Sequence, residues 1–132
     1  MEIREELEEL RAKLDKGFSP ETSNTGDSST SKGHCAAVAY IVHRLYGGDY
    51  LSTNWKGESH WFNLIPYNGE VYEVCLTSDQ FDRLPPIMWS KLHECSRGLY
   101  PDTVVRDQSD LGQKTIDRAW LLADYCCLDL KI

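Results

Sequence analysis

A chain of 132 residues, 41% hydrophobic and 27% charged, has the length and composition of a single globular domain spanning residues 1–132. Its formal net charge of −7 argues against nucleic-acid binding and against docking on anionic membranes, because both require a basic surface. Its apolar runs fall short of the roughly 20 residues of a membrane span, and the acidic residues 1–6 do not resemble a signal peptide. We therefore expect a cytoplasmic protein.

Residues 1–16 predict an N-terminal helix. Glutamates cover most of its surface, and one apolar stripe recurs at helical spacing: Ile3, Leu7, Leu10 and Leu14. We expect this stripe to pack on the rest of the domain; the alternative is a homodimer through this helix. Residues 18–33 follow as a loop that is polar after Phe18, so we expect its tip to be mobile.

Residues 34–46 predict a central helix that is apolar on almost all sides and therefore buried. Cys35 lies in its first turn, and Gly47-Gly48 ends it. Residues 59–77 then predict a β-hairpin, because Asn68-Gly69 is the strongest short-range signal for a tight turn between strands.

The two-residue turn fixes the register of this hairpin by pairing Tyr67 with Glu70. Trp61 and Asn63 point to one face, since side chains alternate along a strand. The opposite face carries His60, Phe62, Leu64, Glu73, Cys75 and Thr77. Pro66, which lacks a backbone N–H, predicts an edge position or a bulge.

The remaining pattern predicts a helix over residues 87–95 after Pro85-Pro86, a connection over 98–112, and a last helix over 115–128. The predicted fold class is α+β. A central cysteine-bearing helix packs on a small antiparallel sheet, with additional helices at the N- and C-terminal ends.

The cysteines are irregularly spaced and contain no CxxC pair. The sequence therefore predicts neither a disulfide framework nor a zinc site, and we expect no metal and no cofactor. The five residues are Cys35, Cys75, Cys95, Cys126 and Cys127.

Cys35 and His60 are the candidate nucleophile and base. A thiol nucleophile must ionise, lie near a base, and have donors for the charge that develops on the attacked carbonyl. A helix N-terminus depresses a thiol pKa, and its free N–H groups form an oxyanion hole. A strand-borne histidine facing a helix-borne cysteine is the papain-like arrangement.

A third group normally orients the histidine, and Glu73 and Cys75 are the candidates on its face. Strand alternation excludes Asn63 unless Pro66 introduces a bulge that shifts the strand. Trp55 and Trp61 are candidate substrate-binding residues that line the cleft.

These motifs together resemble the YunG family. The resemblance runs over about residues 18–81, with a weaker match near residues 115–123, and the ordered set of motifs is more specific than any one of them. The motifs are Glu21-Thr22-Ser23, Gly33-His34-Cys35-Ala36, Tyr46-Gly47-Gly48-Asp49, Ser59-His60-Trp61-Phe62-Asn63 and Leu76-Thr77-Ser78-Asp79-Gln80-Phe81.

The family pattern is similar to the NlpC/P60 and transglutaminase-like branches of the papain-like fold, which implies a thiol hydrolase or acyl transferase acting on an amide. This chain departs from the pattern twice. The family's Gln before the cysteine is His34, which would replace it as an oxyanion donor. The family's Asp falls on Cys75, so Glu73 or water substitutes for that Asp, or the site is impaired.

We therefore expect a cysteine-dependent amide hydrolase (peptidase, amidase or deamidase) whose substrate is a peptide, a protein or a small amide. The alternative is a catalytically impaired papain-like scaffold that acts as a protein-binding module. A third hypothesis is a metal or redox protein that uses Cys35, Cys75 and His60.

Overall fold

The computed structural model describes residues 2–24, 26, 30–55, 57–81, 84–92 and 98–130, and for Trp55 the backbone alone. The helices in this part are α1 (Ile3–Gly17), α2 (Cys35–Tyr46) and α3 (Gln113–Tyr125), with short 3-10 helices η1 (Ser78–Gln80) and η2 (Gln108–Asp110). The strands are β1 (Asp49–Trp55), β2 (Glu58–Tyr67), β3 (Glu70–Cys75), β4 (Met88–Lys91) and β5 (Val104–Arg106). They form one antiparallel sheet in the order β4-β3-β2-β1-β5, so the α+β class is confirmed.

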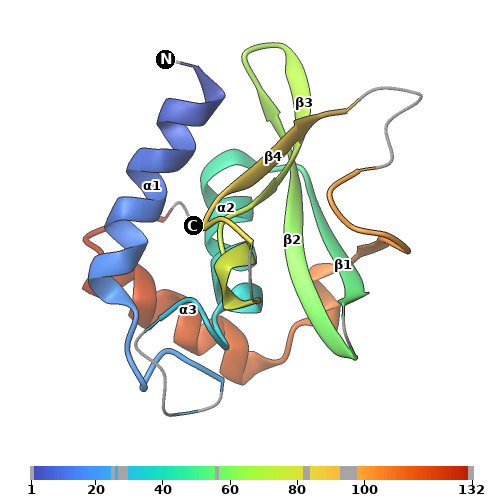
Figure 1. Cartoon of the computed structure of the whole chain (residues 1–132). Helices are drawn as coiled ribbons and strands as arrows, with labels where there is room; N and C mark the ends of the chain where they lie inside the picture. The colour runs from blue at the N-terminus through green and yellow to red at the C-terminus, as the bar shows by residue number, and fades with distance from the viewer. Residues whose placement is uncertain are drawn as a thin grey trace.

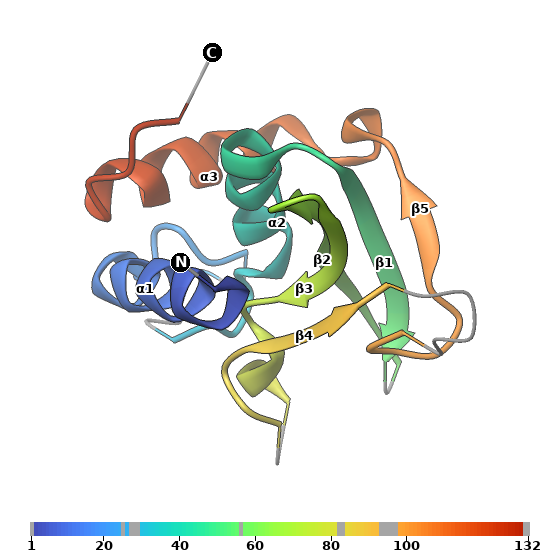
Figure 2. The same ribbon diagram turned by 90° about the horizontal axis from the view of Figure 1, so that it is seen from above.

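The α-helices gather on one side of a curved sheet, with α2 lying against the sheet (Figures 1 and 2). The main core fills the space between α1, α2, α3 and this face of the sheet. A second, smaller cluster lies on the opposite face, where it joins Leu51, Phe62 and Cys75 to Tyr100 from the segment before β5. The opposite face of the sheet is therefore covered in part.

The N-terminal helix packs on its own domain, as its apolar stripe predicts. Ile3 and Leu10 are 5% exposed, and Leu7 and Leu14 are fully buried. The stripe therefore belongs to the protein's own core and offers no free surface to a second copy. Arg11, on the same helix, is also buried, at 7% exposure.

The chain leaves α2 through two glycines and turns directly into β1. Gly48 has a φ of +83°, which L side chains rarely adopt, and a Cβ there would collide with the carbonyl of Leu64 in β2. Glycine at this position therefore allows the end of α2 to lie close against the sheet.

The predicted hairpin register is confirmed over the paired part of β2 and β3, from Tyr67 with Glu70 to Asn63 with Val74. Pro66 pairs regularly with Val71 and causes no bulge. It is tolerated because β1 pairs with β2 only as far as Leu64, so no neighbouring strand needs an N–H from Pro66.

The helix predicted over residues 87–95 is wrong. Residues 88–91 form the edge strand β4, which pairs with β3, and residues 93–97, including Cys95, lie outside the described part of the chain. Pairing with a partner strand distant in sequence outweighed the local helical pattern. The predicted last helix is confirmed as α3, although it starts earlier and ends earlier than expected.

The loop before α2 is polar in composition, yet several of its side chains are buried. Thr22, Ser23 and Ser31 are at most 3% exposed. The predicted mobile tip falls on residues 25 and 27–29, which lie outside the described residues. Across the described helices, none is long and apolar enough to cross a membrane.

Candidate functional site

Cys35 is the first residue of α2 and remains partly exposed at its surface. Burial raises the pKa of its thiol above the ordinary value. Hydrogen bonds from the Trp61 backbone, the Gln80 side chain and the first backbone N–H groups of α2 oppose this shift without reversing it. The expectation that the helix N-terminus depresses this pKa is therefore wrong for the resting protein, because desolvation of the thiolate outweighs the N–H groups.

His60 lies in β2 and is fully buried. Its ring is enclosed by aromatic rings, with centroids 4.9 Å from Phe81 and 5.1 Å from Tyr100. Burial lowers the pKa of His60 to about 4. The imidazole is therefore neutral at physiological pH.

Both ring nitrogens of His60 have polar partners. The Gln80 Nε2 lies 2.5 Å from Nδ1, and the Cys75 Sγ lies 3.1 Å from Nε2. An amide nitrogen can only donate, so Nδ1 accepts and Nε2 carries the proton that points at the Cys75 sulfur. The orientation of the Gln80 amide is supported by its oxygen, which accepts from the Gly33 N–H at 3.4 Å.

Cys75 occupies the orienting position beside His60. Its sulfur also accepts a hydrogen bond of 3.3 Å from the Tyr100 hydroxyl. Burial raises the pKa of Cys75 to about 11, with the hydrogen bonds from Tyr100 and Thr77 acting in the opposite direction. The group that contacts His60 Nε2 is therefore a neutral thiol that is itself held in place by a buried phenol.

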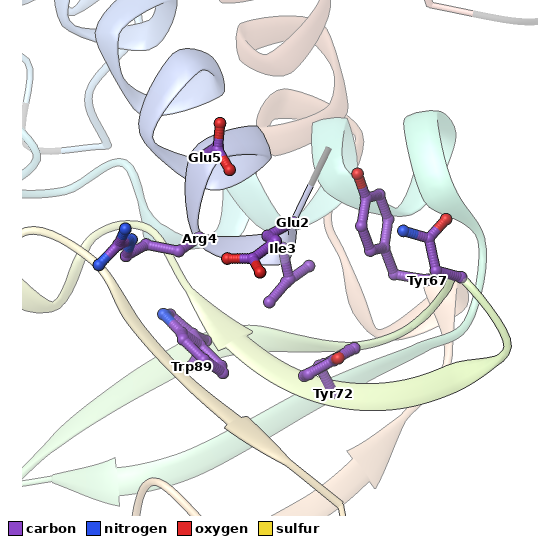
Figure 3. A pocket seen from close by; sticks show the side chains of 8 residues that line it. Glu2, Ile3, Arg4, Glu5, Tyr67, Tyr72 and Trp89 are labelled. Carbon is purple, nitrogen blue, oxygen red and sulfur yellow. The ribbon is translucent and has the colours of Figure 1, made fainter.

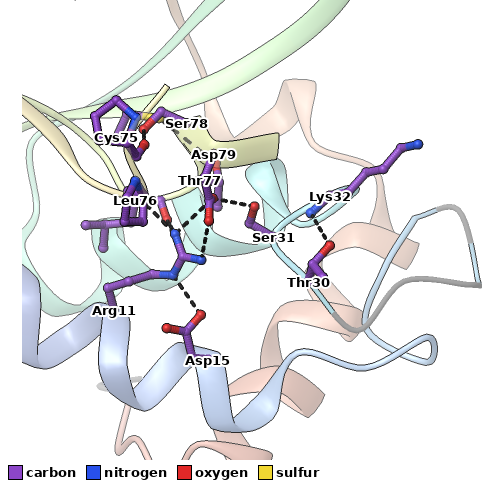
Figure 4. Close-up of polar contacts among 12 residues, drawn as sticks. Arg11, Asp15, Thr30, Ser31, Lys32, Cys75, Leu76, Thr77, Ser78 and Asp79 are labelled. Atoms are coloured by element: carbon purple, nitrogen blue, oxygen red, sulfur yellow. Dashed lines mark hydrogen bonds and ion pairs between the residues drawn. The ribbon is translucent and has the colours of Figure 1, made fainter. Parts of the chain in front are cut away.

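Gln80 is the last residue of η1, and the residue before it, Asp79, is held firmly in place. Arg11 reaches across from α1 and holds both carboxylate oxygens of Asp79, at 3.0 and 2.8 Å, and also donates to the backbone carbonyls of Leu76 and Pro86 (Figure 4). The Ser31 hydroxyl donates to Asp79 at 2.5 Å. Although burial raises the pKa of Asp79, the hydrogen bonds from Arg11 and Ser31 lower it overall. This network fixes the turn that presents Gln80 to His60.

Two of the residues that the sequence predicted for the site, His34 and Glu73, make structural contacts away from His60. His34 is fully buried at the N-cap position of α2, where its side chain makes no capping hydrogen bond. Its ring lies 4.5 Å from the Phe18 ring, with Nε2 2.7 Å from the Thr22 hydroxyl. These contacts anchor the preceding loop to the start of α2. Glu73 is buried farther along β3, where its carboxylate accepts from the Leu99 N–H at 3.5 Å; Cys75 is the residue of this pair that contacts His60.

Of the two tryptophans expected in the cleft, the structure describes the side chain of Trp61 alone. Trp61 packs against the main core, 5.9 Å from the Tyr50 ring, and reaches Cys35 through its backbone rather than its indole. The side chain of Trp55 lies outside the described residues. Asn63 is excluded from the site as strand alternation predicted, and its amide donates to the Ala39 carbonyl in α2.

Sequence reasoning missed Gln80 and Tyr100. Gln80 stands within the quoted Leu76-to-Phe81 motif, so its presence was visible but its role was not. Tyr100 lies in an irregular connection and carries no local signal, since only folding brings it to Cys75 and His60. Among the described residues, no group of three or more His, Cys, Asp or Glu side chains is arranged to hold a metal ion.

A family model described as YunG protein matches residues 6–118 of this chain. The match runs from the first turn of α1 into the first half of α3 and includes every residue of the site. Comparison with curated proteins and comparison with solved structures found no match.

Proposed function

This chain belongs to the YunG family, and we propose that it is a cysteine-dependent amide hydrolase with a papain-like site. Cys35 is the nucleophile, His60 the base, and Cys75 the residue that orients His60. The substrate is a peptide, a protein or a small amide, and the free thiols among the described cysteines suit a reducing compartment such as the cytosol.

The observation that carries this proposal is the polar chain through His60. Cys75 holds one ring nitrogen at 3.1 Å, and Gln80, at 2.5 Å from the other, also hydrogen-bonds the thiol of Cys35. Nucleophilic catalysis requires a base that is oriented by one neighbour and connected to the nucleophile. Here Cys75 orients His60, and the Gln80 side chain connects His60 to the thiol at the start of α2. A buried structural cysteine needs none of these contacts.

In the proposed reaction both groups start neutral. The Cys35 sulfur attacks the amide carbonyl while its proton passes to His60, and His60 then gives that proton to the leaving amine as the C–N bond breaks. Water, deprotonated by His60, hydrolyses the thioester and regenerates the thiol. The backbone N–H groups near Cys35 and the Gln80 amide are the oxyanion donors. Gln80 must release His60 Nδ1 for the first transfer.

The test is formation of an acyl-enzyme. The protein is mixed with p-nitrophenyl acetate, and acetylation is located by intact-mass and peptide mass spectrometry. We expect a burst of p-nitrophenol release that acetylates Cys35 and turns over, and no burst in Cys35→Ala. In His60→Gln we expect slower acetylation of Cys35 and an adduct that persists. Cys127, which is exposed, provides the internal control for an unactivated thiol. Acetylation of Cys127 at least as fast as Cys35 would contradict the proposal.

A second candidate, the catalytically impaired scaffold that binds protein, is favoured by one observation. The position that orients His60 holds a thiol, and the pKa values of Cys35 and His60 are shifted in the directions that keep both neutral. The same experiment distinguishes the two, since a scaffold gives no burst at Cys35 and the same slow acetylation in His60→Gln.

A further inference from the structure

A cavity lies away from Cys35, where the start of α1 faces the sheet. It has a volume of about 770 Å³ and is bordered by the first turn of α1, the end of the β2–β3 hairpin and the edge strand β4 (Figure 3). Nothing in the proposed reaction uses it. An inference about its ligand therefore goes beyond the proposed function and does not rest on it.

Aromatic rings form one wall of this cavity. Trp89 in β4 remains 40% exposed, and its ring meets that of Tyr72 edge to face at 5.9 Å. Tyr67 borders the same space from the end of the hairpin. The faces of aromatic rings attract cations, and the exposed indole of Trp89 offers such a face.

Carboxylates border the cavity from the side of α1. Glu2 and Glu5 line it and are both exposed. The one basic side chain among its lining residues, Arg4, is ion-paired with Glu8 at 3.7 Å. The helix N-terminus contributes a partial positive charge, which the acidic first turn offsets. The cavity therefore combines negative charge with π faces, in a chain whose net charge is −7.

We propose that this cavity binds a lysine side chain of a basic peptide segment, with the ammonium group over Trp89 and Tyr72 and within reach of Glu2 and Glu5. Its volume holds more than one side chain, so the flanking peptide lies in the cavity as well. The recognised chemistry is a primary ammonium on an alkyl stem: the stem packs on the rings, and the charge faces the carboxylates.

The test follows the indole N–H resonance of Trp89 by 1H–15N NMR in the full chain, assigned by its loss in Trp89→Phe. The probe is acetyl-Gly-Lys-Gly-amide, and acetyl-Gly-Gln-Gly-amide is its neutral counterpart. We expect a saturable shift with the lysine peptide, weaker in higher salt, and little shift with the glutamine peptide.

Variants separate charge from ring contributions. We expect Glu2→Gln combined with Glu5→Gln to weaken binding at least three-fold, and Trp89→Leu, followed through neighbouring backbone resonances, to weaken it by a similar factor. The matched control, Glu58→Gln with Asp124→Asn, removes two exposed carboxylates elsewhere and should leave binding unchanged.

Three results overturn the proposal: no saturable shift with the lysine peptide, equal shifts with both peptides, or equal weakening by the control pair. Inorganic phosphate is the remaining probe. A saturable shift with phosphate in place of the lysine peptide would assign the start of α1 and Arg4 to an anion instead.

Discussion

His60 Nε2 lies 3.1 Å from the sulfur of Cys75. A carboxylate at this distance would favour the charged imidazolium, whereas a thiol whose pKa is raised to about 11 gives it no opposite charge. Nothing then offsets the desolvation of His60. This pair therefore determines whether the site rests neutral or ionised.

We predict that Cys75→Asp raises the pKa of His60 well above its value of about 4. The introduced carboxylate would accept from His60 Nε2 and from the Tyr100 hydroxyl, both of which already face this position. The measurement is the pH titration of the His60 ring by NMR, with Cys75→Ser as the neutral control. Equal pKa values for His60 in the two variants would show that Cys75 does not control its charge.

Alkylation of Cys35 by iodoacetamide should rise with pH and give an apparent pKa above the free thiol value of about 8.5. The physical reason is that burial raises the pKa of Cys35. Gln80→Leu should raise it further, because one hydrogen bond that stabilises the thiolate is lost. Gln108→Leu, at an exposed position in η2, is the control. A pKa below the free value would mean that the thiolate is stabilised more than its burial indicates.

Stability should fall as the pH decreases from about 6.5 to 4. The unfolded state takes up a proton on His60 near pH 6.5, whereas the folded state resists protonation until the pH approaches about 4. Over that range the unfolded state binds more protons, so the free energy of unfolding decreases with acidity by up to roughly 3 kcal/mol.

Urea denaturation at pH 7 and pH 4.5 measures this loss. His60→Gln should be less stable at pH 7 but should lose less stability between the two pH values. A buried His34, whose pKa is also lowered by burial, accounts for part of the remaining loss. An identical pH dependence in His60→Gln would contradict the neutral, buried state of His60.

Asp79→Asn should destabilise the protein by about 2–4 kcal/mol, because it leaves the Arg11 guanidinium buried beside a neutral amide. Asp15→Asn offers a matched control on the same guanidinium. Asp15 is 55% exposed, so its loss should cost under about 1 kcal/mol. Both are measured by urea denaturation. An equal loss of unfolding free energy in the two variants would show that Asp79 stabilises the fold no more than Asp15 does.

The features that the sequence predicted are those with local causes. The hairpin register followed from Asn68-Gly69, and the burial of α2 followed from its apolar composition. The strand at residues 88–91 was missed because its pairing with β3 joins segments separated in the chain. Pro85-Pro86 resembled a helix start, and no local pattern marks an edge strand that gains its stability from a partner.

The residues of the candidate site also separate into those with a local signal and those placed by tertiary contacts. Cys35, His60 and Cys75 could be proposed from the sequence because a helix start and a strand register place them. Gln80 and Tyr100 were not assigned roles, since each acts through a tertiary contact. The raised pKa of Cys35 could not be predicted from the sequence. A helix N-terminus suggests a lowered pKa, whereas desolvation of the thiol, visible only in the fold, raises it.

The reach of Arg11 has a consequence for the order in which the chain assembles. Its partners beyond α1 are the carboxylate of Asp79 and the carbonyls of Leu76 and Pro86, which lie 65 to 75 positions further along the chain. During synthesis, α1 is therefore complete long before its buried guanidinium has any of these partners. The N-terminal helix therefore gains the polar partners of its one buried guanidinium only after the hairpin and the turn that follows it have been synthesised.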